Sequence, residues 1–138
     1  MKLEFLPDLT DGGKYKQVVA EKIVRLYDFD HKEATFFREA LQETVIRNKL
    51  KLDLASLPFV EAINCNLVFH LSDRDVGIET EDGSNFICEL TMEAYKSMVY
   101  LLEPFCDANN HGSGYNWLYK NYDIGTNIHL LFSPGGTW

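Results

Sequence analysis

The chain has 138 residues and a formal net charge of −8, and hydrophobic residues make up 46% of it. A chain of this length can bury roughly two-thirds of its unfolded surface in one core. Its hydrophobic content, with 13% aromatic residues, excludes a disordered tail. No apolar run approaches the roughly 20 residues that cross a bilayer, and the opening MKLEFLPDLTDGG lacks the apolar segment of a signal peptide. We therefore expect one domain over residues 1–138, in a bacterial cytoplasm and away from membranes.

The negative charge is confined to the second half of the chain. Residues 1–60 hold ten Lys/Arg and ten Asp/Glu, whereas residues 61–138 hold three Lys/Arg and eleven Asp/Glu. A field of this sign repels phosphate backbones and speeds encounters with basic proteins. We expect no direct nucleic-acid binding, and a basic protein is the favoured partner if the acidity does more than maintain solubility.

Three cysteines, Cys65, Cys88 and Cys106, are widely spaced along the chain. An odd number without a secretion signal argues against a disulfide framework. Cys65 and Cys88 stand among apolar residues, where a free cysteine usually packs as a small hydrophobic residue. We expect reduced thiols.

The first elements in chain order are predicted to be two strands and a helix. A short strand KLEFL and a turn PDLTDGG precede a long strand, KQVVAEKIVRLYDFD, at 16–30. Residues 30–48 then show apolar side chains every three or four positions, as on the buried face of an amphipathic helix. Asp30 is expected to cap this helix, and Glu33 completes an acidic capping box, which we prefer to a metal site here.

A short strand within KLKLDLASLP, ended by Pro58, and an antiparallel meander over 62–90 are expected next. If Glu81, Asp82 and Gly83 form a three-residue loop, Ile78 lies opposite Phe86. A two-residue loop would mix the apolar and polar faces, so the three-residue loop is preferred.

The last part of the chain is predicted to contain a second helix over 91–107, capped by Thr91 and ended or kinked by Pro104. A short helical turn from Tyr115 to Tyr119 and a final strand, TNIHLLF, follow. The elements together predict an α+β fold: a single domain with a mostly antiparallel sheet of about six strands and two main helices packed on one face.

The HGSG segment offers a candidate nucleophile. A nucleophile elbow needs small residues two positions on either side of the serine, whereas Ser113 has His111 and Tyr115 there. No phosphate-loop ending is present. We interpret Ser113 as the cap of the short helical turn that follows.

The four histidines show no spacing typical of zinc ligands; they are His31, His70, His111 and His129. His70 and His129 lie on predicted strands and could share a site only if those strands are neighbours. We expect no metal ion and no cofactor.

Two groups of residues are candidates for a partner-binding surface. The first is acidic, on or beside the predicted hairpin, and comprises Asp73, Asp75, Glu79, Glu81, Asp82 and Glu89. The second is aromatic and comprises Tyr115, Trp117 and Tyr119, with Tyr122 close by. A solvated sheet face and a cover for the core are the simpler interpretations, but acidic residues beside Tyr and Trp are also typical of a docking surface.

Two hypotheses remain. The first is a non-enzymatic protein-binding module, which docks a basic partner through the acidic C-terminal half as an immunity protein or antitoxin does. This analogy rests on charge and size and identifies no family. The alternative is a small-ligand-binding or enzymatic domain with a pocket between sheet and helices, using His70, His129 or His111.

Overall fold

The computed structural model describes residues 1–9, 12–14, 22–110, 112–120 and 128–138, which form two α-helices and nine strands in two sheets. The first sheet has the order β4-β1-β2-β9-β8. Its strands are β1 (Lys2–Leu6), β2 (Lys22–Tyr27), β4 (Glu61–Ala62), β8 (Asn116–Tyr119) and β9 (Ile128–Phe132). The second sheet has the order β3-β5-β7-β6. Its strands are β3 (Leu52–Asp53), β5 (Asn66–Leu71), β6 (Gly77–Thr80) and β7 (Asn85–Leu90).

The α+β class is confirmed, but the expectation of one mostly antiparallel sheet of about six strands is wrong. In the first sheet β2 is antiparallel to β1 and parallel to β9, and β1 is parallel to β4. Parallel neighbours need long connections, and β2 and β9 stand about a hundred residues apart in the sequence. Of the long strand expected at 16–30, residues 22–27 form β2, whereas 28–30 lie outside the strand because Asp28 has a positive φ of 52°. Residues 15–21 lie outside the described ranges.

The predicted meander is also wrong, because β5 pairs with β7 in parallel and β6 lies at the outer edge of β7. The hairpin register differs by two residues from the prediction, with Ile78 opposite Cys88 and Thr80 opposite Phe86. Asp82 explains the longer loop, since its carboxylate accepts hydrogen bonds from the backbone N–H groups of Ser84 and Asn85, both at 2.8 Å. An even shift leaves every side chain on its predicted face.

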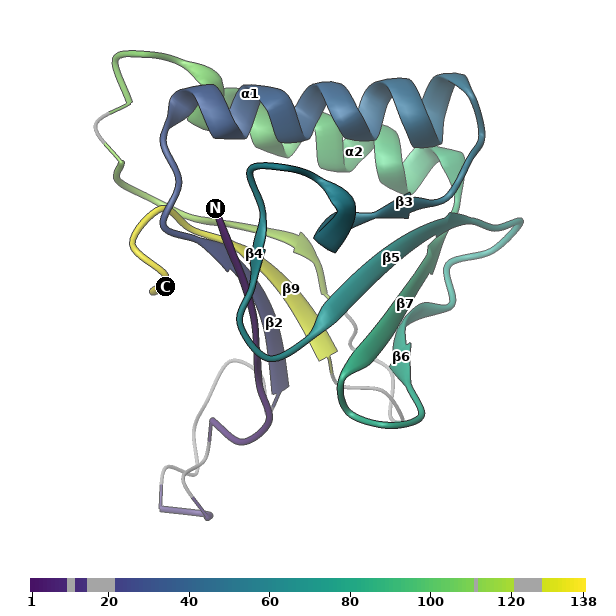
Figure 1. Ribbon diagram of the computed structural model, residues 1–138, viewed down its shortest axis with the longest axis vertical. Coiled ribbons are helices and arrows are strands. Elements are labelled where there is room, and N and C mark those ends of the chain that lie inside the picture. Colours follow the sequence, from purple (N-terminus) through teal and green to yellow (C-terminus); the bar gives the residue numbers. More distant parts are fainter. Residues whose placement is uncertain (10–11, 15–21, 111, 121–127) are drawn as a thin grey trace.

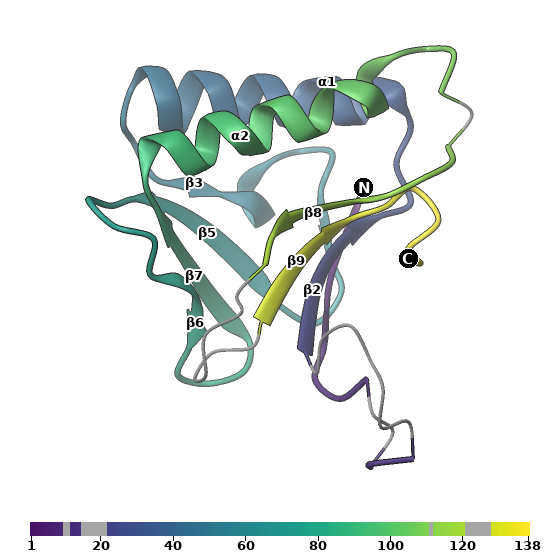
Figure 2. The same ribbon diagram turned by 180° about the vertical axis from the view of Figure 1, so that it is seen from behind.

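The two helices lie side by side across one end of the sheets (Figures 1 and 2). Helix α1 (His31–Ala40) begins at Asp30, whose side chain accepts the backbone N–H of Glu33 at 2.8 Å, and the capping box is complete. The chain continues from α1 as a π-helical segment, Leu41–Arg47. Helix α2 (Met92–Leu102) is capped by Thr91, and a 3₁₀ turn that contains Pro104 follows it. Both predicted caps are thus present.

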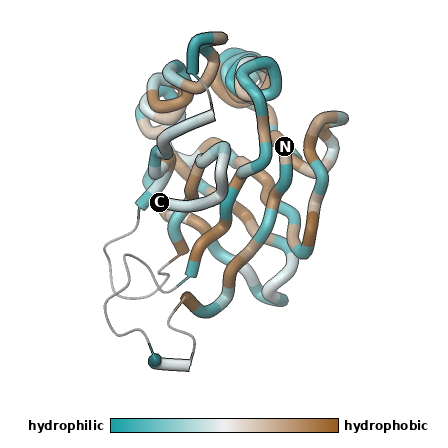
Figure 3. The backbone as a smooth tube through the Cα atoms, turned by 90° about the vertical axis from the view of Figure 1, so that its left-hand side faces the viewer, coloured by the Kyte–Doolittle hydropathy of each residue, from teal (hydrophilic) through white to brown (hydrophobic). Residues whose placement is uncertain are grey.

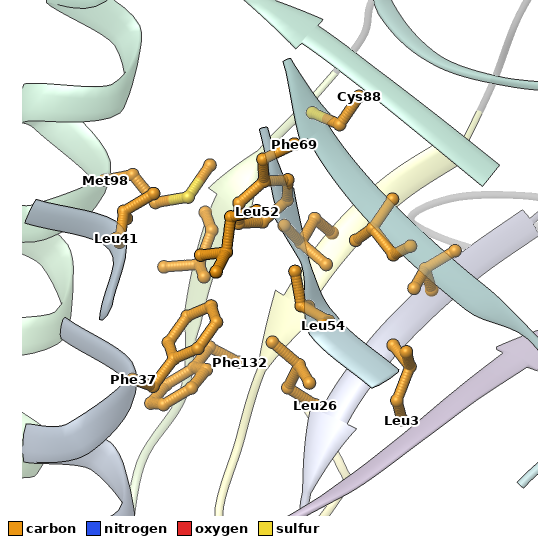
Figure 4. Packing of buried hydrophobic residues seen from close by; sticks show 14 of the residues in the cluster. Leu3, Leu26, Phe37, Leu41, Leu52, Leu54, Phe69, Cys88, Met98 and Phe132 are labelled. Atoms are coloured by element: carbon orange, nitrogen blue, oxygen red, sulfur yellow. The ribbon is translucent and has the colours of Figure 1, made fainter. Parts of the chain in front are cut away.

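One apolar cluster fills the space between the two sheets and the helices (Figure 4). Phe5 of the first sheet lies against Phe86 of the second with ring centroids 4.6 Å apart, and Phe37 of α1 stacks on Phe132 at 5.7 Å. Hydrophobic and hydrophilic positions interleave along the strands, as one buried and one outward face require (Figure 3). Cys65 and Cys88 are buried free thiols, and burial raises the pKa of Cys65 to about 11, so neither is a reactive thiolate.

The helical turn expected from Tyr115 to Tyr119 is instead strand β8, so Ser113 does not cap a helix. Strand β8 pairs antiparallel with β9, with an irregularity between Trp117 and Tyr119. Leu118 lies at this irregularity and is buried in the main core, against which Tyr119 also packs. Pairing with β9 therefore overrides the local signal from Ser113 and its flanking glycines.

Candidate functional site

Four strands of the second sheet align two rows of side chains on opposite faces. One row is Leu52, Phe69, Cys88 and Ile78, read across β3, β5, β7 and β6. All four are buried in the main core. The next position along each strand gives the second row, which is Asp53, Val68, Ile87 and Glu79. Because successive strand residues point to opposite faces, this second row lies on the face turned away from the core.

The outward row is apolar in the middle and acidic at both ends. Ile87 is 42% exposed and Val68 is half-buried, whereas Asp53 and Glu79 are exposed. With strands about 4.8 Å apart, the backbone positions of Asp53 and Glu79 are about 14 Å from one another. Two neighbours, His70 and Glu89, face each other in the next outward row. We call these six residues the acidic sheet face: Asp53, Val68, His70, Glu79, Ile87 and Glu89.

The three carboxylates of this face outnumber the nearby Lys51 ammonium, so its net charge is negative. Burial, aided by the nearby Lys51 ammonium, holds the pKa of His70 below its usual value, and Glu89 opposes this only in part. His70 is therefore mostly neutral near pH 7 and does not cancel the charge of Glu89. Among the residues that the structure describes, no ion pair involves the six carboxylates predicted for docking.

Two of those six carboxylates form hydrogen bonds that stabilise the fold. Asp75 accepts the backbone N–H of Thr91 at 2.8 Å and so fixes the start of α2. Asp82 organises the β6–β7 loop, and its hydrogen bonds to Asn85 and Ser84 hold its pKa well below the usual range. Glu79 and Glu89 belong to the acidic sheet face. Asp73 is exposed in the connection between β5 and β6, and Glu81 is exposed directly after β6.

The predicted aromatic residues do not join the acidic sheet face. Trp117 packs on Ile23 and Leu131, which form a small buried cluster on the other side of the first sheet from the main core. Tyr115 lies edge-on to Trp117 at 6.3 Å and is 45% exposed. Tyr119 reaches Gly77 of the second sheet. A Cβ atom added to Gly77 would lie 2.6 Å from the Tyr119 hydroxyl. Tyr122 falls outside the described residues.

The two described histidines of the alternative hypothesis, His70 and His129, lie on different sheets. His70 lies on β5 of the second sheet, and His129 is buried on β9 of the first sheet, 5.7 Å from the Trp117 ring. His111 falls outside the described ranges. His31 lines a small pocket of about 230 Å³ at the start of α1, whose Asp30 and Asn110 are already engaged in hydrogen bonds with the backbone. Within the described residues, no three His, Cys, Asp or Glu side chains are grouped to hold a metal ion.

Sequence reasoning missed the apolar centre of the acidic sheet face. Ile87 alternates with the inward-facing Phe86 and Cys88, so its outward direction was implied by the predicted hairpin faces. The position of Val68 beside it depends on the parallel pairing of β5 with β7, for which the sequence carries no local signal.

No protein-family model, no curated protein and no solved structure matches this chain. In the ranges that the structure describes, no helix is both long and apolar enough to cross a membrane.

Proposed function

We propose that this chain is a non-enzymatic protein-binding module that docks a basic partner through the acidic sheet face, as an immunity protein or antitoxin masks a basic cleft. One observation carries the proposal. On the outward face of the second sheet, the exposed Ile87 lies between carboxylates that form none of the described ion pairs. Neither helix covers this face, because both cross the end of the sheets (Figures 1 and 2).

In protein interfaces, charged residues at the rim and apolar residues at the centre affect different rate constants, and this surface has both kinds of residue. Unpaired carboxylates at the rim steer a basic protein toward the surface and set the association rate. A central apolar side chain that becomes buried on docking contributes to the lifetime of the complex. Ile87 and Val68 provide that centre, and Asp53, Glu79 and Glu89 surround it.

The experiment compares what three immobilised proteins retain from a native lysate at low and high salt. The first is the wild type, and the second carries Glu79→Gln, Glu81→Gln and Glu89→Gln. The third is a control of equal charge, in which the exposed Glu61, Glu93 and Glu103 are changed to Gln. A partner of this face is retained by the wild type and the control, is lost from the second protein, and binds less at high salt.

The captured protein is then purified and its binding to the three proteins is measured directly. Equal binding to all three would show that the acidic sheet face is not the docking surface. An acidic captured protein, or binding that does not weaken with salt, would also contradict the proposal.

A further inference from the structure

A second surface of the protein has a different character. It is a shallow groove of about 680 Å³ that runs along α1 and the π-helical segment. Its apolar lining comes from Phe36 and Ala40 on α1 and from Pro58 and Phe59, which belong to the connection between β3 and β4. The groove shares no residue with the acidic sheet face.

The floor of the groove is an aromatic pair that is only partly covered. The rings of Phe36 and Phe59 are 5.8 Å apart, and Phe36 remains 50% exposed. Phe37 beside it is fully buried in the core, so the helix turns successive phenylalanines to different environments. A half-exposed Phe in a groove is an anchor point, since covering the rest of its ring removes apolar surface from water and so favours binding.

The rim of the groove is polar and negative. Glu39 and Glu43 stand four residues apart and so project from the same side of the helix. Neither Lys nor Arg lines the groove. Glu43 forms an ion pair with Arg47 at 3.0 Å, but both side chains are more than half exposed, and such a pair is worth little and can be exchanged.

We propose that this groove binds an amphipathic, basic helix of a protein partner. A bulky apolar side chain of that helix lies on Phe36 and Phe59, and a Lys or Arg one turn away pairs with Glu39. The charge of the rim favours a basic segment. The helical lining of the groove extends from Phe36 to Thr44, about two and a half turns, along which a short amphipathic helix can lie. The inference does not depend on the acidic sheet face.

The test uses three synthetic peptides as probes. The first is an amphipathic helix of Leu, Ala and Lys with Leu at i, i+4 and i+7. The second has Glu in place of every Lys, and the third is a scrambled form of the first. Binding is measured by fluorescence anisotropy at physiological salt, and amide chemical shifts locate the contact. We expect the Lys peptide alone to bind, with the largest shifts around Phe36 and Phe59.

Matched variants separate this groove from other surfaces. Phe36→Ala should weaken binding of the Lys peptide about tenfold or more, whereas Tyr100→Ala, which removes a 71% exposed ring from α2, should not change it. Glu39→Gln with Glu43→Gln should weaken binding of the Lys peptide. Glu93→Gln with Glu103→Gln removes the same charge outside both proposed surfaces and should leave the affinity unchanged.

Several outcomes would overturn the inference. They are no binding of the Lys peptide, equal binding of the Glu peptide, and equal losses from Phe36→Ala and Tyr100→Ala. Sedimentation of the protein alone tests a further contrary outcome. If the protein is a dimer and Phe36→Ala makes it a monomer, the groove binds a second copy of this chain.

Discussion

The hydroxyl of Tyr95 on α2 donates a hydrogen bond to the carbonyl oxygen of Cys88 on β7, at 2.8 Å. The same hydroxyl lies 2.7 Å from the carbonyl oxygen of His70 on β5. Burial raises the pKa of the Tyr95 phenol, so it remains a donor throughout the working pH range. One side chain thus ties the second helix to the two central strands that carry the acidic sheet face.

Tyr95→Phe tests this connection. The variant keeps the ring but leaves buried carbonyl groups with one donor fewer, so we expect the free energy of unfolding to fall by about 1–3 kcal/mol. Chemical denaturation measures it. Tyr100→Phe is the control, because Tyr100 is 71% exposed, and it should change stability by less than about 0.5 kcal/mol. Equal effects of the two changes would show that the Tyr95 hydroxyl is not a structural tie.

The capping box at the start of α1 gives a second prediction. Asp30→Ala removes the acceptor for the Glu33 backbone N–H and should cost about 0.5–2 kcal/mol in thermal or chemical unfolding. Asp30→Asn, which keeps a capping oxygen, should retain most of the stability. Partner binding by both variants should match the wild type; loss of binding at unchanged stability would mean that Asp30 belongs to a functional site.

These two helix starts were predictable because a cap is a local device. Asp30 and Glu33 are three residues apart and meet in any helix that begins there, and the same holds for Thr91 and α2. The faces of β6 and β7 were predictable for a related reason, since a register shift of two residues preserves the alternation. Local periodicity thus placed Glu79 and Glu89 on the outward face even though the paired residues were wrong.

Pairings between distant segments were not predictable. No sequence pattern near β5 indicates that it pairs in parallel with β7, or that β6 lies at the edge of the sheet. Strand β8 was mistaken for a helical turn because Ser113 and its glycines resemble a cap, whereas its partner β9 begins at Ile128. The position of Trp117 over Ile23 and Leu131 depends on that pairing, so the predicted aromatic docking surface could not be judged from the sequence.

Gly77 is predicted to be intolerant of any side chain. It has φ +102°, and an added Cβ would lie 2.6 Å from the Tyr119 hydroxyl. Gly83 also has positive φ, but nothing lies within 4 Å of an added Cβ there. Gly77→Ala should therefore lower the free energy of unfolding more than Gly83→Ala, which carries only the cost of its backbone conformation, about 1–2 kcal/mol. Tyr119→Phe should recover part of the excess; an equal cost at both glycines would refute the contact.

His70 should make stability depend on pH in a defined direction. Its pKa is lower in the folded protein than in the unfolded chain, so the unfolded state takes up the proton first as pH falls. The free energy of unfolding should decrease as pH drops below the unfolded value of about 6.5. His70→Gln should reduce that slope, as measured by denaturation at several pH values. A steeper slope in the variant would reverse the assigned direction.

The final prediction concerns the kinetics of docking to the captured basic partner. Changing Glu79, Glu81 and Glu89 together to Gln should slow association, most strongly at low salt, because rim charges act through long-range steering. Asp75 is left intact since its bond to Thr91 is structural. Ile87→Ala should instead raise the dissociation rate, about 30-fold if the side chain contributes about 2 kcal/mol.

Trp117→Ala is the comparison variant. Because Trp117 packs on buried residues of the first sheet, its replacement should lower the free energy of unfolding. Both rate constants of docking should stay near the wild-type values. Stopped-flow mixing and surface-based dissociation measure the two rate constants separately. If the charge variant dissociates faster at an unchanged association rate, the carboxylates form direct contacts and do not steer. If His70 or Ser113 proves essential to a measured turnover while the carboxylates and Ile87 are dispensable, the protein is an enzyme, and the acidic sheet face is only its solvated exterior.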